Sequence, residues 1–159
     1  SKALLFHYFR NKKDLYLYLW DNAADLTQKA TMQYKTTQTT NFFEMLRRNL
    51  LAKCSLMRDY TYIYRFSMQA YYETEPEIKK AIQDKVSDTI KVSTQVIFET
   101  IDKSLFRPDI DLSMMYKEIV FAVDGYMLNM YRTGPINADK IENEIDELIK
   151  FWERVYTQQ

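Results

Sequence analysis

The chain has 159 residues, with 22 basic and 22 acidic side chains and a formal net charge of zero. Its 47% hydrophobic content excludes a disordered chain, and its single cysteine, Cys54, excludes a scaffold held by intrachain disulfides. The longest apolar run, residues 15–20, is too short to cross a membrane, and we expect a cytoplasmic protein. Only two glycines are present, whereas β folds and α/β folds need many glycine-containing turns. The composition therefore predicts an all-α protein.

Apolar residues recur every three or four positions along most of the chain, which predicts six amphipathic helices. Asn11 is an expected N-cap for the first helix, and Asn41 with Glu44 forms a capping box at the start of the second. Pro76 fits the first turn of the fourth helix, and Pro108 ends it because proline cannot continue the hydrogen-bond ladder. The expected helices cover residues 14–34, 42–57, 59–72, 76–106, 111–132 and 138–156.

The first sixteen residues, SKALLFHYFRNKKDLY, combine basic and aromatic side chains. They predict a short helix, a two-residue corner and the start of a new helix. Four bases precede the first acid, Asp14, whereas residues 138–159 hold six acids against three bases. The net charge of zero hides this asymmetry, and a basic start points to an anionic partner at that end.

This segment resembles the recognition-helix end of the TetR family of bacterial transcriptional regulators. The family pattern is roughly Ser-Lys-Gly-x-Leu-Tyr-x-x-Phe-x-x-Lys-x-x-Leu. The frame formed by Leu5, Phe9, Lys12 and Leu15 fits in full, whereas alanine replaces the usual glycine at position 3 and phenylalanine replaces the usual tyrosine at position 6. The match covers about a tenth of the chain.

The resemblance implies two parts: residues 1–12 as the remnant of a helix-turn-helix DNA-binding domain whose first two helices precede Ser1, and residues 13–159 as an all-α ligand-binding and dimerisation domain. The 159 residues alone would then bind DNA weakly. The implied function is a regulator, expected to be a repressor, that binds a palindromic operator as a homodimer. A small lipophilic or aromatic effector would release it, and a fatty acid or acyl-CoA is the alternative effector. The implied DNA contacts are Ser1, Lys2 and Leu4 to base edges, and His7, Tyr8 and Lys12 to phosphates.

Residues 57–72 hold five tyrosines, a phenylalanine and two methionines. A buried tyrosine needs a partner for its hydroxyl, so this cluster predicts either a hydrogen-bonded core or a pocket with apolar walls and a few polar groups. Methionine adds an adaptable surface to such a pocket. The candidate ligand-binding residues are Met57, Tyr60, Tyr64, Met68, Tyr71, Phe98, Tyr126 and Met130.

Gly125 lies in the middle of the fifth predicted helix, where glycine costs about 1 kcal/mol relative to alanine. Close approach of a partner helix would explain it, and the family resemblance implies that the last two helices pair with their symmetry mates in a four-helix bundle. Ordinary packing within the chain is the alternative. The expected interface residues are Val120, Asp124, Gly125, Met127, Ile145, Leu148 and Trp152.

Enzymatic chemistry has little support in the sequence. The single histidine, His7, falls in the DNA-binding segment, and Cys54 lies on an apolar helical stripe, where it is expected to be a core residue. No metal-ligand spacing, phosphate loop or glycine-rich fingerprint occurs. We expect no enzyme activity, cofactor or metal. A helical protein-interaction module without DNA binding, or a small helical enzyme, are the alternatives to a regulator.

Overall fold

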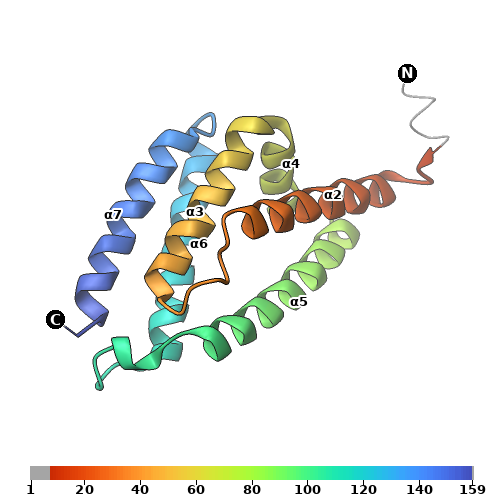
Figure 1. The fold of residues 1–159 in the computed structure, drawn as a ribbon. Helices are drawn as coiled ribbons and strands as arrows, with labels where there is room; N and C mark the ends of the chain where they lie inside the picture. Colours follow the sequence, from red (N-terminus) through yellow and green to blue (C-terminus); the bar gives the residue numbers. More distant parts are fainter. Residues whose placement is uncertain (1–7, 159) are drawn as a thin grey trace.

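The computed structural model describes residues 8–158, and this part of the chain is all-helical, as predicted. No strand is formed in it, although an isolated antiparallel bridge links Phe106 to Thr157. Figure 1 shows the order of the elements. These are α2 (Lys12–Gln33), α3 (Phe42–Asp59), α4 (Thr61–Tyr71), α5 (Pro76–Thr100), the 3-10 helix η1 (Lys103–Leu105), α6 (Leu112–Thr133) and α7 (Ala138–Tyr156).

Short polar side chains begin four of the helices. Asn11, Asn41, Asp111 and Asn137 each accept a hydrogen bond from a backbone N–H two or three residues further on, at 2.8–3.1 Å. The first N–H groups of a helix have no partner inside the helix, so these oxygens satisfy donors that would otherwise be unpaired. The N-caps expected at Asn11 and Asn41 are confirmed.

Helix α5 ends earlier than predicted: the expected helix over residues 76–106 stops at Thr100. The backbone of Ile101 is extended, with φ −69° and ψ 142°, and the N–H of Asp102 donates to the carbonyl of Thr40 at 2.8 Å. Asp102 then caps η1. This break brings both Ile101 and Phe106 into the hydrophobic core. No glycine or proline lies beside Thr100 to indicate the break from the sequence.

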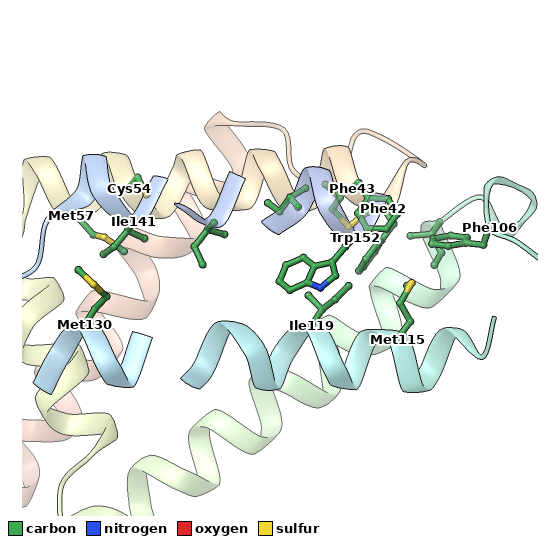
Figure 2. Close-up of a cluster of buried hydrophobic side chains, with 14 residues drawn as sticks. Phe42, Phe43, Cys54, Met57, Phe106, Met115, Ile119, Met130, Ile141 and Trp152 are labelled. Carbon is green, nitrogen blue, oxygen red and sulfur yellow. The ribbon is translucent and has the colours of Figure 1, made fainter. Parts of the chain in front are cut away.

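The larger hydrophobic core lies between α3, α6 and α7. Figure 2 shows Trp152 between the α3 and α7 helices and α6, close to Ile119. At one end, the rings of Phe42 and Phe43 pack against Phe106 with centroids 6.1 and 6.0 Å apart. All five side chains are at most 4% exposed, so three helices from distant parts of the sequence share one apolar interior.

Two arginines of α3 bind acidic residues of α7 at the edges of this core. Arg47 contacts Glu153, and Arg58 contacts Asp139 and Glu142 at 2.7 and 2.6 Å. The pairs order the two helices antiparallel, because the later arginine meets the earlier acids. The acidic excess of the last helix is therefore largely matched inside the chain.

A smaller core forms where α2, α4 and α5 meet. Ala70 of α4 and Ile78 and Ile82 of α5 are at most 1% exposed, and Leu17 and Trp20 of α2 pack against them. Figure 1 shows α2 and α5 close together at this end and separating toward the other, where α5 leads to the larger core. Helix α5 therefore bridges two separate apolar clusters.

Replacing Trp152 by alanine is expected to lower the free energy of unfolding by about 3–5 kcal/mol, because a large cavity would open between α7 and α6. Urea denaturation followed by circular dichroism measures the change. The control is Tyr62→Ala on α4, where the side chain is 87% exposed and a change within about 0.5 kcal/mol is expected. Equal losses for the two variants would contradict this placement of the core.

Candidate functional site

An open groove of about 730 Å³ runs from the end of α4 along α5. At the α4 end, the groove is lined by Tyr71, Tyr72 and the turn residues Glu73 and Thr74. This volume lies in the range of small-molecule sites, so the groove is the candidate ligand-binding site. The lining residues contributed by α5 are Lys79, Ile82, Gln83, Val86, Ser87, Ile90 and Lys91.

The groove exists because α5 is packed at its two ends and not in its middle. Ile78 and Ile82 belong to the smaller core, while Ile97 and Phe98, more than four turns later, pack against the larger one. Ile90, between them, is 46% exposed. The middle of α5 therefore presents apolar side chains that no part of the described chain covers.

Two tyrosine rings line the α4 end of the groove, and a third stacks on one of them. The Tyr71 and Tyr72 centroids are 4.8 Å apart in an edge contact, and Tyr72 stacks on Tyr131 of α6 at 5.5 Å. Burial, and then the negative charge of Asp124, raise the pKa of Tyr72 to about 12 and also raise that of Tyr71. The Tyr72 hydroxyl is buried and has no hydrogen-bond partner among the described residues. This end combines aromatic faces with a nearby carboxylate.

Of the eight predicted ligand-binding residues, only Tyr71 lines this groove. Five of the others occupy the larger core or pack against it, where they contact the chain itself. Helical periodicity places these residues on an apolar face but does not say which neighbour that face meets. The five residues are Met57, Tyr64, Phe98, Tyr126 and Met130.

A second, much smaller cavity separates α2 from α3 and α4. Tyr60 and Tyr64 border it, and its volume of about 20 Å³ holds no more than a water molecule. Met68, the eighth predicted residue, is buried at 9% exposure and lines neither space. Of the five tyrosines in residues 57–72, Tyr64 packs against the larger core and Tyr72 is half-buried, whereas Tyr60, Tyr62 and Tyr71 are exposed. The tyrosine-rich segment is thus divided between the interior and the surface.

Sequence reasoning missed the α5 residues of the groove, above all Ile82, Val86 and Ile90. They recur at every fourth position, which by itself indicates only the apolar face of an amphipathic helix. Lys79 and Lys91, which flank these residues in the sequence, were the feature that could have indicated a binding face. Only the separation of the two cores shows that the middle of the stripe stays uncovered.

The N-terminal segment is described only from Tyr8 onward. Tyr8 is 74% exposed, and the ring of Phe9 packs against Tyr18 with centroids 5.3 Å apart. Helix α2 follows directly after Asn11, so this segment continues into the body without a linker. The predicted DNA-binding residues that lie outside the described residues are Ser1, Lys2, Leu4 and His7.

Lys12, the remaining predicted phosphate contact, is engaged within the chain. Its Nζ lies 3.2 Å from Glu75 Oε2 and 3.7 Å from Glu73 Oε2, and 5.1 Å from the ring centroid of Tyr16. The hydrogen bond to Glu75 is the main cause of the raised pKa of Lys12. Because Glu73 also lines the groove, this contact ties the first turn of α2 to the groove edge.

Helices α6 and α7 are joined along their length by two tyrosine–glutamate hydrogen bonds. The Tyr126 hydroxyl donates to Glu144 at 2.6 Å, and the Tyr156 hydroxyl donates to Glu118. The helices are therefore antiparallel, and positions 121 and 151 fall at the same level between the two bonds. Both positions carry phenylalanine, 64% and 50% exposed. We call these two side chains the phenylalanine pair.

The predicted interface residues divide between the core and this surface. Ile145 and Trp152 are buried in the larger core, and Met127 and Leu148 pack against it, so the first two have no surface for a partner. Val120 is half-buried, and Asp124 and Gly125 are exposed. On α6 and α7, the exposed large apolar residues that the sequence did not single out are Met114, Phe121 and Phe151.

Gly125 needs no close contact within the chain. A Cβ atom added there would meet no atom within 4 Å, so intrachain packing does not require glycine at this position. Gly125 lies one turn after Phe121 on the same face of α6. Of the two sequence-based explanations for this mid-helix glycine, packing within the chain is therefore not supported.

No group of three metal-ligating side chains comes together within residues 8–158. Among the helices of that range, none combines the length and apolarity needed to cross a membrane. Comparisons of the chain with family models, with curated proteins and with solved structures found no match. The fold and the groove thus define an all-helical chain with a candidate small-molecule site.

Alkaline pH is expected to weaken the joint between α6 and α7. The hydrogen bond to Glu118, together with burial, raises the pKa of Tyr156 to about 12, above the ordinary tyrosine value of about 10. Folding therefore favours the protonated phenol, and this stabilisation is complete below about pH 10 and is lost as the pH rises through about 12.

Urea midpoints of the protein and of Tyr156→Phe, compared at pH 8 and pH 11, test this. The variant is expected to lose less stability on going to pH 11. Tyr62→Phe, an exposed position on α4, is the matched control and should follow the unmodified protein. An identical alkaline loss in Tyr156→Phe and the unmodified protein would argue against the role given to this bond.

Proposed function

We propose that this protein is a ligand-responsive transcriptional regulator, a repressor that binds a palindromic operator as a homodimer and is released by a small lipophilic effector. The observation that carries the proposal is the direct connection from the basic N-terminal segment through α2 to the groove edge. Lys12 at the start of α2 contacts Glu73, and Glu73 lines the groove. The resemblance of residues 1–15 to the recognition-helix end of the TetR family is the reason for proposing DNA as the partner.

The groove and the N-terminal segment can influence each other through this connection. The Glu73 carboxylate accepts hydrogen bonds from the N–H groups of Thr74 and Glu75, at 2.8 and 3.2 Å, and also faces Lys12. A ligand that displaces the turn between α4 and α5 would shift the first turn of α2 with it. In a dimer, this shift would change the spacing of the two recognition helices, so effector and operator would oppose each other reciprocally.

The phenylalanine pair and Gly125 support a homodimer through α6 and α7. Phe121 and Phe151 lie at one level of the two helices and are both exposed, and large aromatic side chains of this kind are enriched in interfaces. Gly125 lets a second helix approach closely, which gives a reason for its cost within α6. A two-fold dimer through this surface would also match the symmetry of a palindromic operator.

Binding of the full-length protein to DNA from upstream of its own gene tests the regulatory proposal. In a gel-shift assay, Lys2→Ala is expected to weaken specific binding by about tenfold or more, because a lysine contact to a guanine edge contributes about 1–3 kcal/mol. The control is Lys103→Ala, an exposed lysine of η1. Absence of sequence-specific binding by the unmodified protein would favour a helical interaction module instead.

The dimer surface is tested by Phe121→Asp, which is expected to convert the dimer to a monomer in analytical ultracentrifugation. A carboxylate at the centre of an apolar interface would be desolvated without a partner. Tyr62→Asp is the control, with a comparably exposed aromatic residue on α4.

Gly125→Ala separates the two explanations for this glycine. In an isolated helix, the change would stabilise α6 by about 1 kcal/mol. With a partner helix close by, it should instead raise the dimer dissociation constant about tenfold. A stabilised protein with unchanged association would contradict the proposed interface.

A further inference from the structure

The α5 face that lines the groove consists of two parallel rows of side chains. Ile82, Val86 and Ile90 recur at intervals of four and form an apolar row. Residues at intervals of four lie above one another on a helix. The adjacent row, also at intervals of four, is polar and ends in a cation on each side: Lys79, Gln83, Ser87 and Lys91.

The apolar row becomes more exposed along the groove. Ile82 is 1% exposed, Val86 is half-buried and Ile90 is 46% exposed. At a rise of about 1.5 Å per residue, the row is about 12 Å long. The groove therefore has an apolar, enclosed end near the tyrosines and a more open end near Lys91.

The charges around the groove differ between its two ends. Glu73 lines the tyrosine end, and Asp124 lies close enough to affect both tyrosine hydroxyls. At the open end, Lys91 forms no ion pair with any described residue, although Asp88 lies one turn before it. By contrast, Lys80 and Lys85 on the same helix are paired with Asp84 and Asp21. Lys79, at the tyrosine end, also forms no ion pair with a described residue, but it shares that end with the Glu73 carboxylate. The open end therefore carries the Lys91 cation with no carboxylate among the lining residues beside it.

We propose that the groove binds an elongated amphiphile with an anionic head group, with its apolar tail along Ile82, Val86 and Ile90 and its head group at Lys91 and Ser87. The tail removes the exposed part of this row, at Val86 and Ile90, from water. The Lys91 ammonium and the Ser87 hydroxyl are donors to the head group. This orientation keeps the negative charge away from Glu73 and Asp124.

The inference rests on the proposed function only in that the bound amphiphile would be the effector. Its test uses direct binding to the 159-residue chain without DNA. Three probes share a ten-carbon chain and differ in head group: decanoate, decanol and decyltrimethylammonium. Decanoate and decyltrimethylammonium are titrated below their critical micelle concentrations and decanol below its solubility limit, with isothermal titration calorimetry as the readout.

Decanoate is expected to bind at least tenfold more tightly than decyltrimethylammonium, with decanol between them. Lys91→Gln should weaken decanoate about tenfold and leave decanol unchanged, because only the charged head group loses its partner. The matched control is Lys79→Gln on the same helix, which should change decanoate affinity less than threefold. Ile90→Asn should weaken all three probes, since it interrupts the apolar row at an exposed position.

Tighter binding of the cationic probe, or equal binding of all three, would overturn the anionic head group. A larger effect from Lys79→Gln than from Lys91→Gln would overturn its position. Circular dichroism of each variant establishes that the fold is retained. Failure of DNA binding in the gel-shift assay would leave these results intact and would refute only the regulatory role, so the two proposals fail separately.

Discussion

The packing of α7 against α3 is the contact on which the rest of the structure depends. These helices lie almost a hundred residues apart in sequence and share a buried face that includes Ile141 and Ile149. Each fully buried large apolar side chain contributes about 1.5–3 kcal/mol, whereas partly exposed ion pairs contribute about 1 kcal/mol or less. The apolar face therefore supplies most of the stability, and the Arg47 and Arg58 pairs fix the register of the two helices.

This contact also determines where the chain remains open. Helix α6 closes the α3–α7 core from one side, and the extended residue Ile101 lets the chain leave α5 and enter the same core. Helix α5 is consequently held at its end by the larger core and at its start by the smaller one. A helix of 25 residues anchored at both ends leaves several central turns uncovered, and these turns form the groove.

The two clusters divide the molecule into parts with different roles in the proposed mechanism. The larger core carries the phenylalanine pair and the proposed dimer surface on α6 and α7. The smaller core joins α2, α4 and α5, and so places the groove beside the helix that continues from the N-terminal segment. The Lys12–Glu73 contact lies at this junction. A ligand in the groove would therefore act on the smaller and less extensively packed part of the fold.

The sequence by itself determined the all-α class, the six helices and the N-caps at Asn11 and Asn41, because periodicity and capping act within a few residues. It also indicated that Cys54 is buried, and it raised the question of Gly125. Only the tertiary structure decided which partner each apolar face meets. In the structure, seven of the eight predicted ligand-binding residues lie outside the groove, Trp152 is buried in the core and α5 ends at Thr100. Pairings between helices far apart in the chain depend on shape and burial, which local patterns do not encode.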